Sequence, residues 1–272
     1  MYIYYNEKLI KEVCLQPTCH GFQFGYGLFE TILVKEGLPC FIDMHHQRLL
    51  KGCSQLGLKF KLNVETVTAQ AIKLAEVCNI TEGRLKLICF RDVGCDSTMM
   101  ILSSYKLEEE TLQKGISLEV SRFMRNPHSP ICYMKSLNYI ENMLAKEDAK
   151  AHGYDEALFL NIYSKICEGA VSNIFWIKDN TLYTPEIGCG LLEGITRRQV
   201  KDICGGIGLC LKEDCFDLEV LLQAEEVFVT NSLMGIMPVY KVDNTIYKVS
   251  DYRLTTKIQI KYNEAKICPS LL

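Results

Sequence analysis

The chain has 272 residues, of which 48% are hydrophobic and 23% charged, and its formal net charge is -3. A length of this size is enough for one large or two smaller folded domains, and we expect two. The slight negative charge argues against nucleic acid as the main partner, because phosphate backbones select strongly basic surfaces. No apolar run approaches the roughly 18 residues of a membrane span, so we expect no membrane partner.

The first eight residues lack a basic segment followed by an apolar core, which argues against a secretory signal, and we expect a cytoplasmic protein. The 14 cysteines are scattered without a Cys-x-x-Cys pair, and the adjacent His45 and His46 have no further ligands in range. We therefore expect no metal site, and in a reducing cytosol most of the thiols act as small core side chains.

In the first part of the chain, aromatic and β-branched residues predict a hairpin over residues 1–5 and 8–13. A glycine-broken aromatic stretch, residues 21–27, leads into a strand over residues 28–34, and it suits either the wall of a cleft or a bulged core strand. Asp43 is expected to cap a helix that Gly57 ends. The further elements predicted here are a helix starting at Asn63 and running to about Cys78, and strands over residues 84–90, 99–105 and 116–123.

Pro127 and Pro130 lie near the middle of the chain, where they exclude a long helix. Residues 125–130 are therefore the best interdomain linker, which gives an N-terminal domain of residues 1–124 and a C-terminal domain of residues 131–272.

Lys135 follows these prolines and precedes a segment in which Leu137, Ile140 and Leu144 recur at helical spacing. The lysine is thus expected just before a helix or in its first turn, where the positive end of the helix dipole disfavours a cation. A neutral amine can attack an aldehyde. From this stretch alone, a covalent anchor for a cofactor and an ordinary solvated lysine are both open.

The second part of the chain predicts mixed and antiparallel strands, over residues 156–160, 166–167, 173–177, 181–183 and 226–230. A helix is expected from Thr196, and the preceding Gly194 and Ile195 offer backbone N–H groups that suit a phosphate, although a plain threonine cap has the same pattern. No Gly-x-Gly-x-x-Gly joins a strand to a helix, which disfavours a Rossmann domain.

Three stretches taken together resemble a known family. They are Lys135 before its helix, Glu168 in the glycine-broken segment 167–175, and the helix start at Gly194-Ile195-Thr196. This set resembles the fold-type IV (class IV) pyridoxal phosphate enzymes, which include branched-chain and D-amino-acid aminotransferases and 4-amino-4-deoxychorismate lyase. The resemblance runs from about Gly21 to about Pro238. It implies a mixed α/β fold with a smaller N-terminal α/β domain, a larger C-terminal β/α domain, and pyridoxal 5'-phosphate between them.

The resemblance also implies roles for individual residues. Lys135 would hold the cofactor as a Schiff base and then move protons, and Glu168 would face the pyridine nitrogen and keep it protonated. Arg48 matches the arginine of the family's His-x-x-Arg-Leu segment, which binds the cofactor phosphate. The other implied cofactor contacts are Ile195, Thr196, Asn231 and Ser232 at the phosphate, Leu192 on the ring and Tyr139 at the ring hydroxyl.

The substrate is harder to infer. The strand end at Arg91 lacks the Arg-x-His pattern of D-amino-acid aminotransferases, and the glycine-rich insertion that follows the lysine of branched-chain enzymes is absent. The stretches 125–127, 135–138, 168–173 and 229–232 resemble the lyases more. The resemblance thus implies a homodimeric lyase that acts on a small molecule and converts 4-amino-4-deoxychorismate to 4-aminobenzoate and pyruvate, with Lys135 removing the C4 proton of the substrate aldimine.

The alternatives are an aminotransferase for branched-chain or D-amino acids, which needs a keto-acid acceptor, and a non-catalytic module that binds the cofactor. Intact Lys135 and Glu168 argue against the second alternative. On the substrate side we expect Phe29, with Arg91 and Arg125 as the side chains that bind substrate carboxylates.

Overall fold

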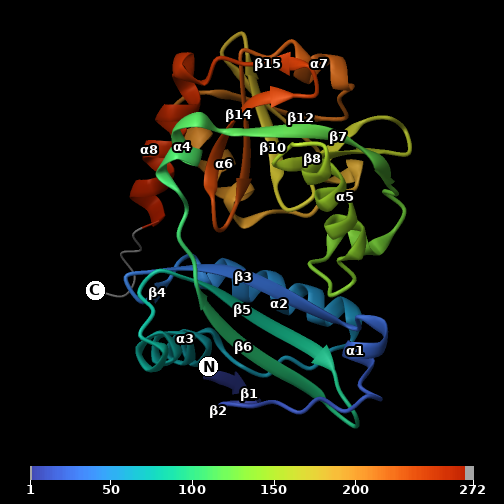
Figure 1. The fold of residues 1–272 in the computed structure, drawn as a ribbon, viewed down its shortest axis with the longest axis vertical. Helices are drawn as coiled ribbons and strands as arrows, with labels where there is room; N and C mark the ends of the chain where they lie inside the picture. The colour runs from blue at the N-terminus through green and yellow to red at the C-terminus, as the bar shows by residue number, and fades with distance from the viewer. Residues whose placement is uncertain (1, 267–272) are drawn as a thin grey trace. The chain divides into compact units, whose positions relative to one another are not determined.

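The computed structural model describes residues 2–266, which divide into two compact units (Figure 1). The first unit runs up to Lys106 and also takes in Met134–Asn138, whereas the second consists of Leu107–Tyr133 and Tyr139–Lys266. The five residues around Lys135 therefore belong to a unit from which they are distant in sequence.

The first unit is built on a six-stranded sheet of order β2-β1-β6-β5-β3-β4. The strands are β1 (Ile3–Tyr5), β2 (Lys8–Ile10), β3 (Gly27–Lys35), β4 (Leu38–Pro39), β5 (Gly83–Arg91) and β6 (Asp96–Ser104). Every pair in it is antiparallel, and β3 pairs with β5 from Gly27 opposite Phe90 to Val34 opposite Gly83. The predicted N-terminal hairpin and the three predicted strands of this unit are confirmed.

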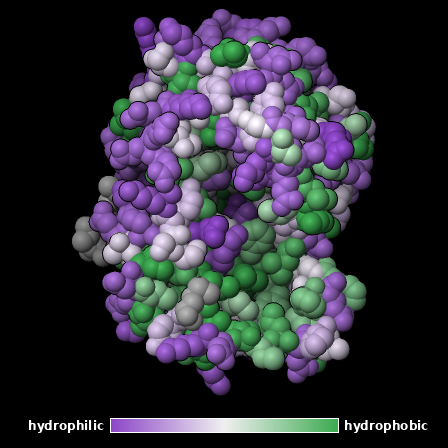
Figure 2. Space-filling view, viewed as in Figure 1, coloured by the Kyte–Doolittle hydropathy of each residue, from purple (hydrophilic) through white to green (hydrophobic). Residues whose placement is uncertain are grey.

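Alternation along β3 decides which side chains enter the core. Leu28, Ile32 and Val34 are buried in one cluster with residues of the helices α2 (Ile42–Leu56) and α3 (Val64–Cys78). Because successive residues of a strand point to opposite faces, Phe29 and Thr31 lie on the other face of the sheet. Figure 2 shows apolar side chains gathered on the visible face of this unit, over β3, β5 and β6.

The helices of the first unit begin in different ways. Asn63 caps α3 as predicted, since its side chain accepts a hydrogen bond from the backbone N–H of Thr66. Asp43, however, does not cap α2: the cap position is Phe41, whose φ of 52° is left-handed, and Asp43 lies in the first turn. There its charge still suits the positive helix end. The short helix α1 (His20–Phe24) ends at Gly25, within the glycine-broken stretch.

The second unit holds a nine-stranded mixed sheet. Eight strands follow the order β12-β11-β10-β13-β14-β7-β8-β9, and β15 pairs with β14. Their bounds are β7 (Ile116–Arg125), β8 (Glu156–Asn161), β9 (Ile166–Gly169), β10 (Asn173–Lys178), β11 (Thr181–Pro185), β12 (Cys210–Asp214), β13 (Glu226–Asn231), β14 (Gly235–Val242) and β15 (Thr245–Ile246). The predicted hairpin of β10 and β11 is confirmed.

The strand β7 belongs to this second sheet. It runs parallel to both β8 and β14, and the helix α5 (Ile140–Ala151) connects β7 to β8. Parallel neighbouring strands need such a crossover connection, so β7 and α5 belong to the same unit. The prolines predict a boundary at residues 125–130, whereas the two units divide at Lys106 and Leu107 and again on both sides of Met134–Asn138.

Several elements of the second unit had no clear signal in the sequence. They are the strands β12, β14 and β15 and the helices α4 (Glu109–Lys114), α7 (Leu218–Leu222) and α8 (Leu254–Lys266). The helix predicted from Thr196 is α6 (Ile195–Gly206). Three single turns of 3-10 helix complete the unit, at Pro130–Tyr133, Ile187–Cys189 and Val249–Asp251. Among the residues described, none of the helices is long and apolar enough to cross a membrane.

Candidate active site

Lys135 lies in an extended segment that pairs with the edge of β3. The backbone N–H of Phe29 donates to the carbonyl of Lys135 at 2.9 Å, and Ser136 forms an antiparallel bridge with Leu28. The following helix α5 begins only at Ile140. The position of the lysine is therefore fixed by pairing with a distant strand rather than by the first turn of a helix.

The aromatic ring of Phe29 lies close to two amines. The Nζ atom of Lys135 is 4.5 Å from the ring centroid, and the Nζ atom of Lys86 on β5 is 4.1 Å from it. Phe29, expected on the substrate side, is thus next to the candidate catalytic lysine. Lys86 has no place in the sequence predictions, because its neighbours depend on the pairing of β5 with β3.

Arg48 is held by a buried carboxylate of the same unit. Its guanidinium contacts both oxygens of Glu30, at 2.8 Å from Nε and 2.5 Å from Nη2, and the Nδ1 atom of His45 is 2.7 Å from Glu30 Oε2. Burial alone would raise the pKa of Glu30, but Arg48 and His45 outweigh it and hold that pKa at about 2. The predicted contact of Arg48 with a phosphate stays a prediction.

Arg91 ends strand β5 and is paired. Its Nε atom lies 2.6 Å from Oδ1 of Asp96, and its Nη2 atom donates to the carbonyl of Gly57 at 2.8 Å. The guanidinium also lies 5.1 Å from the ring centroid of Tyr26. These contacts lock the end of the β5–β6 hairpin, which is a structural task for this arginine.

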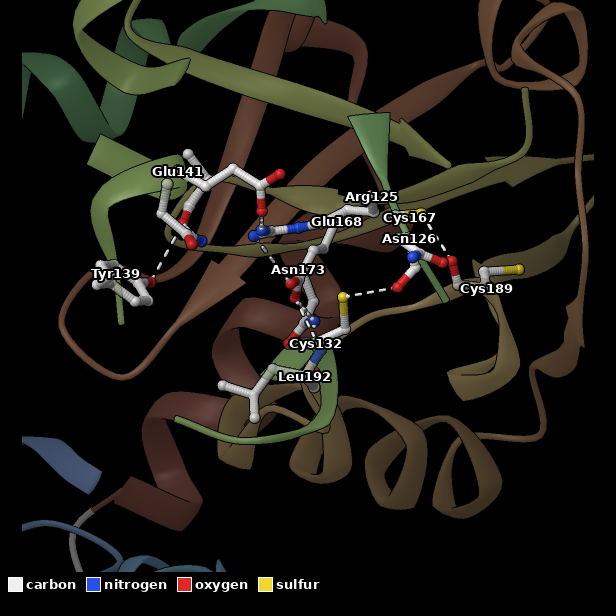
Figure 3. A network of polar contacts seen from close by, with 12 residues as sticks. Arg125, Asn126, Cys132, Tyr139, Glu141, Cys167, Glu168, Asn173, Cys189 and Leu192 are labelled. Carbon is white, nitrogen blue, oxygen red and sulfur yellow. Dashed lines mark hydrogen bonds and ion pairs between the residues drawn. The ribbon is translucent and has the colours of Figure 1, made fainter. Parts of the chain in front are cut away.

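In the second unit, Glu168 on β9 is the centre of a buried polar network (Figure 3). Its Oε2 atom accepts hydrogen bonds from the backbone N–H of Leu192 at 3.0 Å and from the Asn173 side chain at 3.2 Å. Asn173 also donates to the carbonyl of Leu192 at 2.9 Å. The Asn173 side chain lies so close to Gly194 that a Cβ atom added there would be 2.0 Å from Asn173 Oδ1. Only glycine therefore fits at position 194.

Arg125, at the end of β7, faces the same carboxylate. Its Nη2 atom is 3.6 Å from Glu168 Oε1, its Nη1 atom donates to Glu141 on α5, and its guanidinium lies 4.0 Å from the centroid of Phe159. The side chain is buried, and its Nε atom has no hydrogen-bond partner among the residues described. Arg125 therefore places a permanent positive charge beside Glu168.

Tyr139 and Asn142 meet on one carbonyl oxygen close to this network. The hydroxyl of Tyr139 donates to Ala170 O at 3.1 Å, and the Asn142 side chain donates to the same atom at 2.6 Å. Since Ala170 follows Glu168 by two residues, this pair of bonds ties the start of α5 to the end of β9, the strand that carries the carboxylate.

The remaining predicted contacts lie at the start of α6 and after β13. Ile195 and Thr196 are buried in the first turn of α6, with Gly194 as the cap, and the Thr196 hydroxyl is 3.4 Å from that of Tyr262 on α8. The Asn231 side chain donates to the carbonyl of Val171 at 3.2 Å and accepts the N–H of Leu233 and Met234, which shapes the turn that holds Ser232.

The predicted residues thus form two groups. In the first unit are Phe29, Arg48, Arg91 and Lys135, and in the second are Arg125, Tyr139, Glu168, Leu192, Ile195, Thr196, Asn231 and Ser232. Within the second unit, Glu168, Leu192 and Arg125 are brought into one network. Sequence reasoning gave no role to Asn173, Asn142 or Tyr262. The one sequence signal for Asn173 is its place in the same glycine-broken segment as Glu168.

Comparison with known proteins identifies the family of this chain. Residues 27–242 match the family described as amino-transferase class IV. The chain belongs to the class IV aminotransferase family. That family depends on pyridoxal phosphate, so the predictions of family and cofactor are confirmed.

Individual members of the class IV family differ in reaction. The aminodeoxychorismate lyase of Bacillus subtilis is 30% identical over 274 residues, covering 96% of this chain and 94% of the relative. A D-alanine aminotransferase of Staphylococcus epidermidis is also 30% identical, over 82% of each chain. A crystal structure from Legionella pneumophila, provisionally named a 4-amino-4-deoxychorismate lyase, has a TM-score of 0.87 and 29% identity, covering 93% of this chain and 96% of that one. The predicted mixed α/β fold is confirmed by this likeness.

The polar groups of this class IV chain fit the cofactor chemically. A buried carboxylate that is oriented by neighbouring N–H donors suits a protonated ring nitrogen, as at Glu168. A buried helix start with a threonine hydroxyl suits a phosphate, as at Thr196. In the described part of the chain, no group of three or more His, Cys, Asp or Glu side chains could hold a metal ion.

Proposed function

We propose that this class IV enzyme is a 4-amino-4-deoxychorismate lyase that forms 4-aminobenzoate and pyruvate. The observation that carries the proposal is the likeness to the lyase of Bacillus subtilis, which is 30% identical over 96% of the chain. The lyase-like stretches around Lys135, Glu168 and Asn231 support it, as does the absence of an Arg-x-His pattern after β5.

Pyridoxal phosphate supplies an aldehyde that condenses with an amine and a ring that draws electrons from the bonds next to that amine. In the proposal, Lys135 anchors the cofactor and then takes the proton from C4 of the substrate through its Nζ atom. The bond between the ring carbon and the enolpyruvyl oxygen breaks, a proton is returned to the three-carbon product, and the six-membered ring becomes aromatic. Atoms balance without any second substrate.

The second unit would hold the electron-withdrawing end of the cofactor. Glu168 would keep the ring nitrogen protonated, with Asn173 and the Leu192 N–H fixing the orientation of its carboxylate. The first turn of α6, Arg48, and the turn at Asn231 and Ser232 would bind the phosphate. Tyr139 would reach the ring hydroxyl, and Leu192 would pack on the ring.

The second candidate is an aminotransferase for D-amino or branched-chain amino acids, which the relatives of that activity support. The two candidates differ in one requirement, because an aminotransferase needs a 2-keto acid to complete its cycle and the lyase does not.

The deciding experiment incubates the protein loaded with pyridoxal phosphate with 4-amino-4-deoxychorismate and no keto acid, and quantifies 4-aminobenzoate and pyruvate. We expect both products in equal amounts over many turnovers, and none with a Lys135→Ala variant. A wild-type protein that leaves the substrate intact, yet exchanges amino groups between an amino acid and a keto acid, would overturn the lyase proposal in favour of the aminotransferase.

A further inference from the structure

Cys189 and Cys215 lie next to each other in the second unit, with 3.2 Å between their Sγ atoms. Cys189 ends the 3-10 turn that comes after β11, and Cys215 follows β12 directly. The strands β11 and β12 are parallel neighbours that end with Pro185 opposite Asp214, so both cysteines follow the same end of the sheet. The contact between the sulfurs is therefore a result of the strand pairing.

The backbone near both sulfurs is held by other elements of the unit. The carbonyl of Cys189 accepts the side-chain N–H of Asn161 at 3.0 Å. After Cys215, the carbonyl of Phe216 accepts the N–H of Ile166 on β9 at 2.9 Å. A disulfide holds its sulfurs about 2 Å apart, so the two atoms need to approach each other by only about 1 Å. Rotation of the side chains supplies a movement of this size without displacing a strand.

The two thiols differ in their access to solvent. Cys215 is exposed, whereas only 1% of the surface of Cys189 is accessible. A dissolved oxidant thus reaches Cys215 first, and Cys189 reacts through the sulfur that it already contacts. The Cys215 thiol also donates to Oε1 of Glu186 at 3.3 Å. Burial raises the pKa of both thiols, to about 12 for Cys189, so the exchange at neutral pH is slow and is best followed to equilibrium.

We propose that Cys189 and Cys215 form a redox modification site, which closes into a disulfide in the presence of a small dissolved disulfide such as oxidised glutathione. The Cys215 sulfur loses its proton and attacks one sulfur of the oxidant, and the other half leaves as a thiol. The Cys189 sulfur then loses its proton, attacks Cys215 Sγ and releases the second half as a thiol. Two S–H bonds of the protein are replaced by one S–S bond, and the oxidant gains the pair of electrons that the protein loses.

The disulfide restrains the segment that leads to the candidate cofactor contacts. Cys189 is three residues before Leu192, whose N–H donates to Glu168 at 3.0 Å, and five residues before Gly194, the cap of α6. A bond from Cys189 to Cys215 closes a loop of the chain and so restricts the unfolded state most. The inference goes beyond the proposed function, because it holds whichever reaction the enzyme catalyses.

The test equilibrates the protein loaded with pyridoxal phosphate in glutathione buffers, blocks the free thiols with iodoacetamide and identifies linked tryptic peptides by mass spectrometry. Cys189 is the only cysteine of peptide 179–197, and Cys215 is the only one of peptide 213–241. We expect the two peptides to be linked in the oxidising buffer and separate in excess dithiothreitol. Glutathione bound to Cys215 beside an unreacted Cys189 would overturn the inference, as would linkage of either cysteine to a different one.

Two variants separate the two steps of the exchange. In Cys189→Ala we expect the mixed disulfide with glutathione to persist on Cys215, because no second sulfur displaces it. In Cys215→Ser we expect Cys189 to stay reduced at every glutathione ratio, since it is buried, and its modification there would contradict the proposed order of attack. Cys210→Ser removes an exposed thiol of β12 and is the matched control, which should form the linked peptide as the wild type does.

A second pair of thiols provides a comparison within the same sample. Cys53 and Cys89 of the first unit are joined by a side-chain hydrogen bond, and both are buried. They fall in separate tryptic peptides, 52–59 and 87–91, each with one cysteine. Because the oxidant reaches neither sulfur in the folded protein, we expect this pair to stay reduced while Cys189 and Cys215 become linked. Equal linkage of both pairs would mean that unfolded chains are being oxidised, and it would sink the proposal.

Thermal unfolding tests whether the native fold accommodates the bond. The oxidised wild type should have a Tm about 5 °C above that of the reduced protein, because the closed loop restricts the unfolded chain. Cys215→Ser should have the same Tm in both buffers. A lower Tm for the oxidised wild type would show that the bond distorts the fold, and the site would then not be one that the native structure provides.

Discussion

Arg125 and Glu168 face each other in the interior of the second unit, with 3.6 Å between Nη2 of the guanidinium and Oε1 of the carboxylate. The separation is longer than a hydrogen bond, and the same guanidinium donates to Glu141 through Nη1. One buried cation is thus shared by two carboxylates, and its removal would leave their charges uncompensated.

For this reason we expect Arg125→Met to lower the free energy of unfolding by about 3 kcal/mol, as measured by urea denaturation of the cofactor-free protein. Arg122→Met is the control, because Arg122 pairs with Asp148 at 3.0 Å but is 71% exposed, and such surface pairs contribute less than about 1 kcal/mol. Equal losses in the two variants would contradict the view that Arg125 compensates buried charge.

Asn173 orients the Glu168 carboxylate by bridging it to the carbonyl of Leu192. We expect Asn173→Ala to raise the Kd for pyridoxal phosphate about tenfold, because Glu168 then loses the amide donor that orients its Oε2 atom. Visible absorbance during titration with the cofactor measures this. Asn63→Ala should instead cost about 1 kcal/mol of stability through the lost cap of α3 and leave cofactor affinity as it is. An unaltered Kd in Asn173→Ala would rule out the orienting role.

The ion pairs of Glu30 predict sensitivity to acid. The pKa of Glu30 is about 2 in the folded protein against 4.5 for an unperturbed glutamate, so the unfolded chain binds the proton more tightly. The resulting stability, about 3 kcal/mol, is fully present above pH 4.5 and is lost as the pH falls from 4.5 towards 2. Urea denaturation between pH 7 and pH 3 should show a steeper loss for wild type than for Glu30→Gln. Parallel curves would exclude this account.

Gly25 and Gly37 allow a paired test of the contact that holds the Lys135 segment. Both have a left-handed backbone, with φ of 62° and 78°, so alanine is strained at either position. Only at Gly25 would the new Cβ also meet Asn138, at 2.8 Å from Oδ1, while nothing lies within 4 Å of the Cβ at Gly37. We expect both variants to lose about 1 kcal/mol of stability and Gly25→Ala to lose more, together with cofactor binding. Identical cofactor binding in the two variants would show that Asn138 does not position Lys135.

Local patterns predicted much of the secondary structure. Alternation along β3 and β5, the asparagine at the start of α3 and the glycine after α2 each act within a few residues, so the sequence reveals them directly. The prediction that Asp43 caps α2 is wrong, because the cap position is Phe41. This residue adopts a left-handed conformation, which is rare for phenylalanine and which no local pattern indicates.

The candidate site was less predictable, because its contacts depend on pairing between distant segments. The bond from Phe29 to Lys135 joins residues more than 100 positions apart, and the position of Lys86 beside Phe29 follows from the register of β5 against β3. Residue types alone also left the partners of the arginines open. Only the fold assigns Arg91 to Asp96 and Arg125 to Glu141 and Glu168.

The membership of Met134–Asn138 in the first unit has a practical meaning for anyone who wants to produce that unit separately. No continuous stretch of the gene encodes it, because a fragment that stops at Lys106 omits the five residues whose backbone completes the edge of β3. Such a fragment would leave the N–H of Phe29 without the carbonyl of Lys135. A faithful excision therefore requires a rearranged gene in which a short designed connection joins Lys106 to Met134.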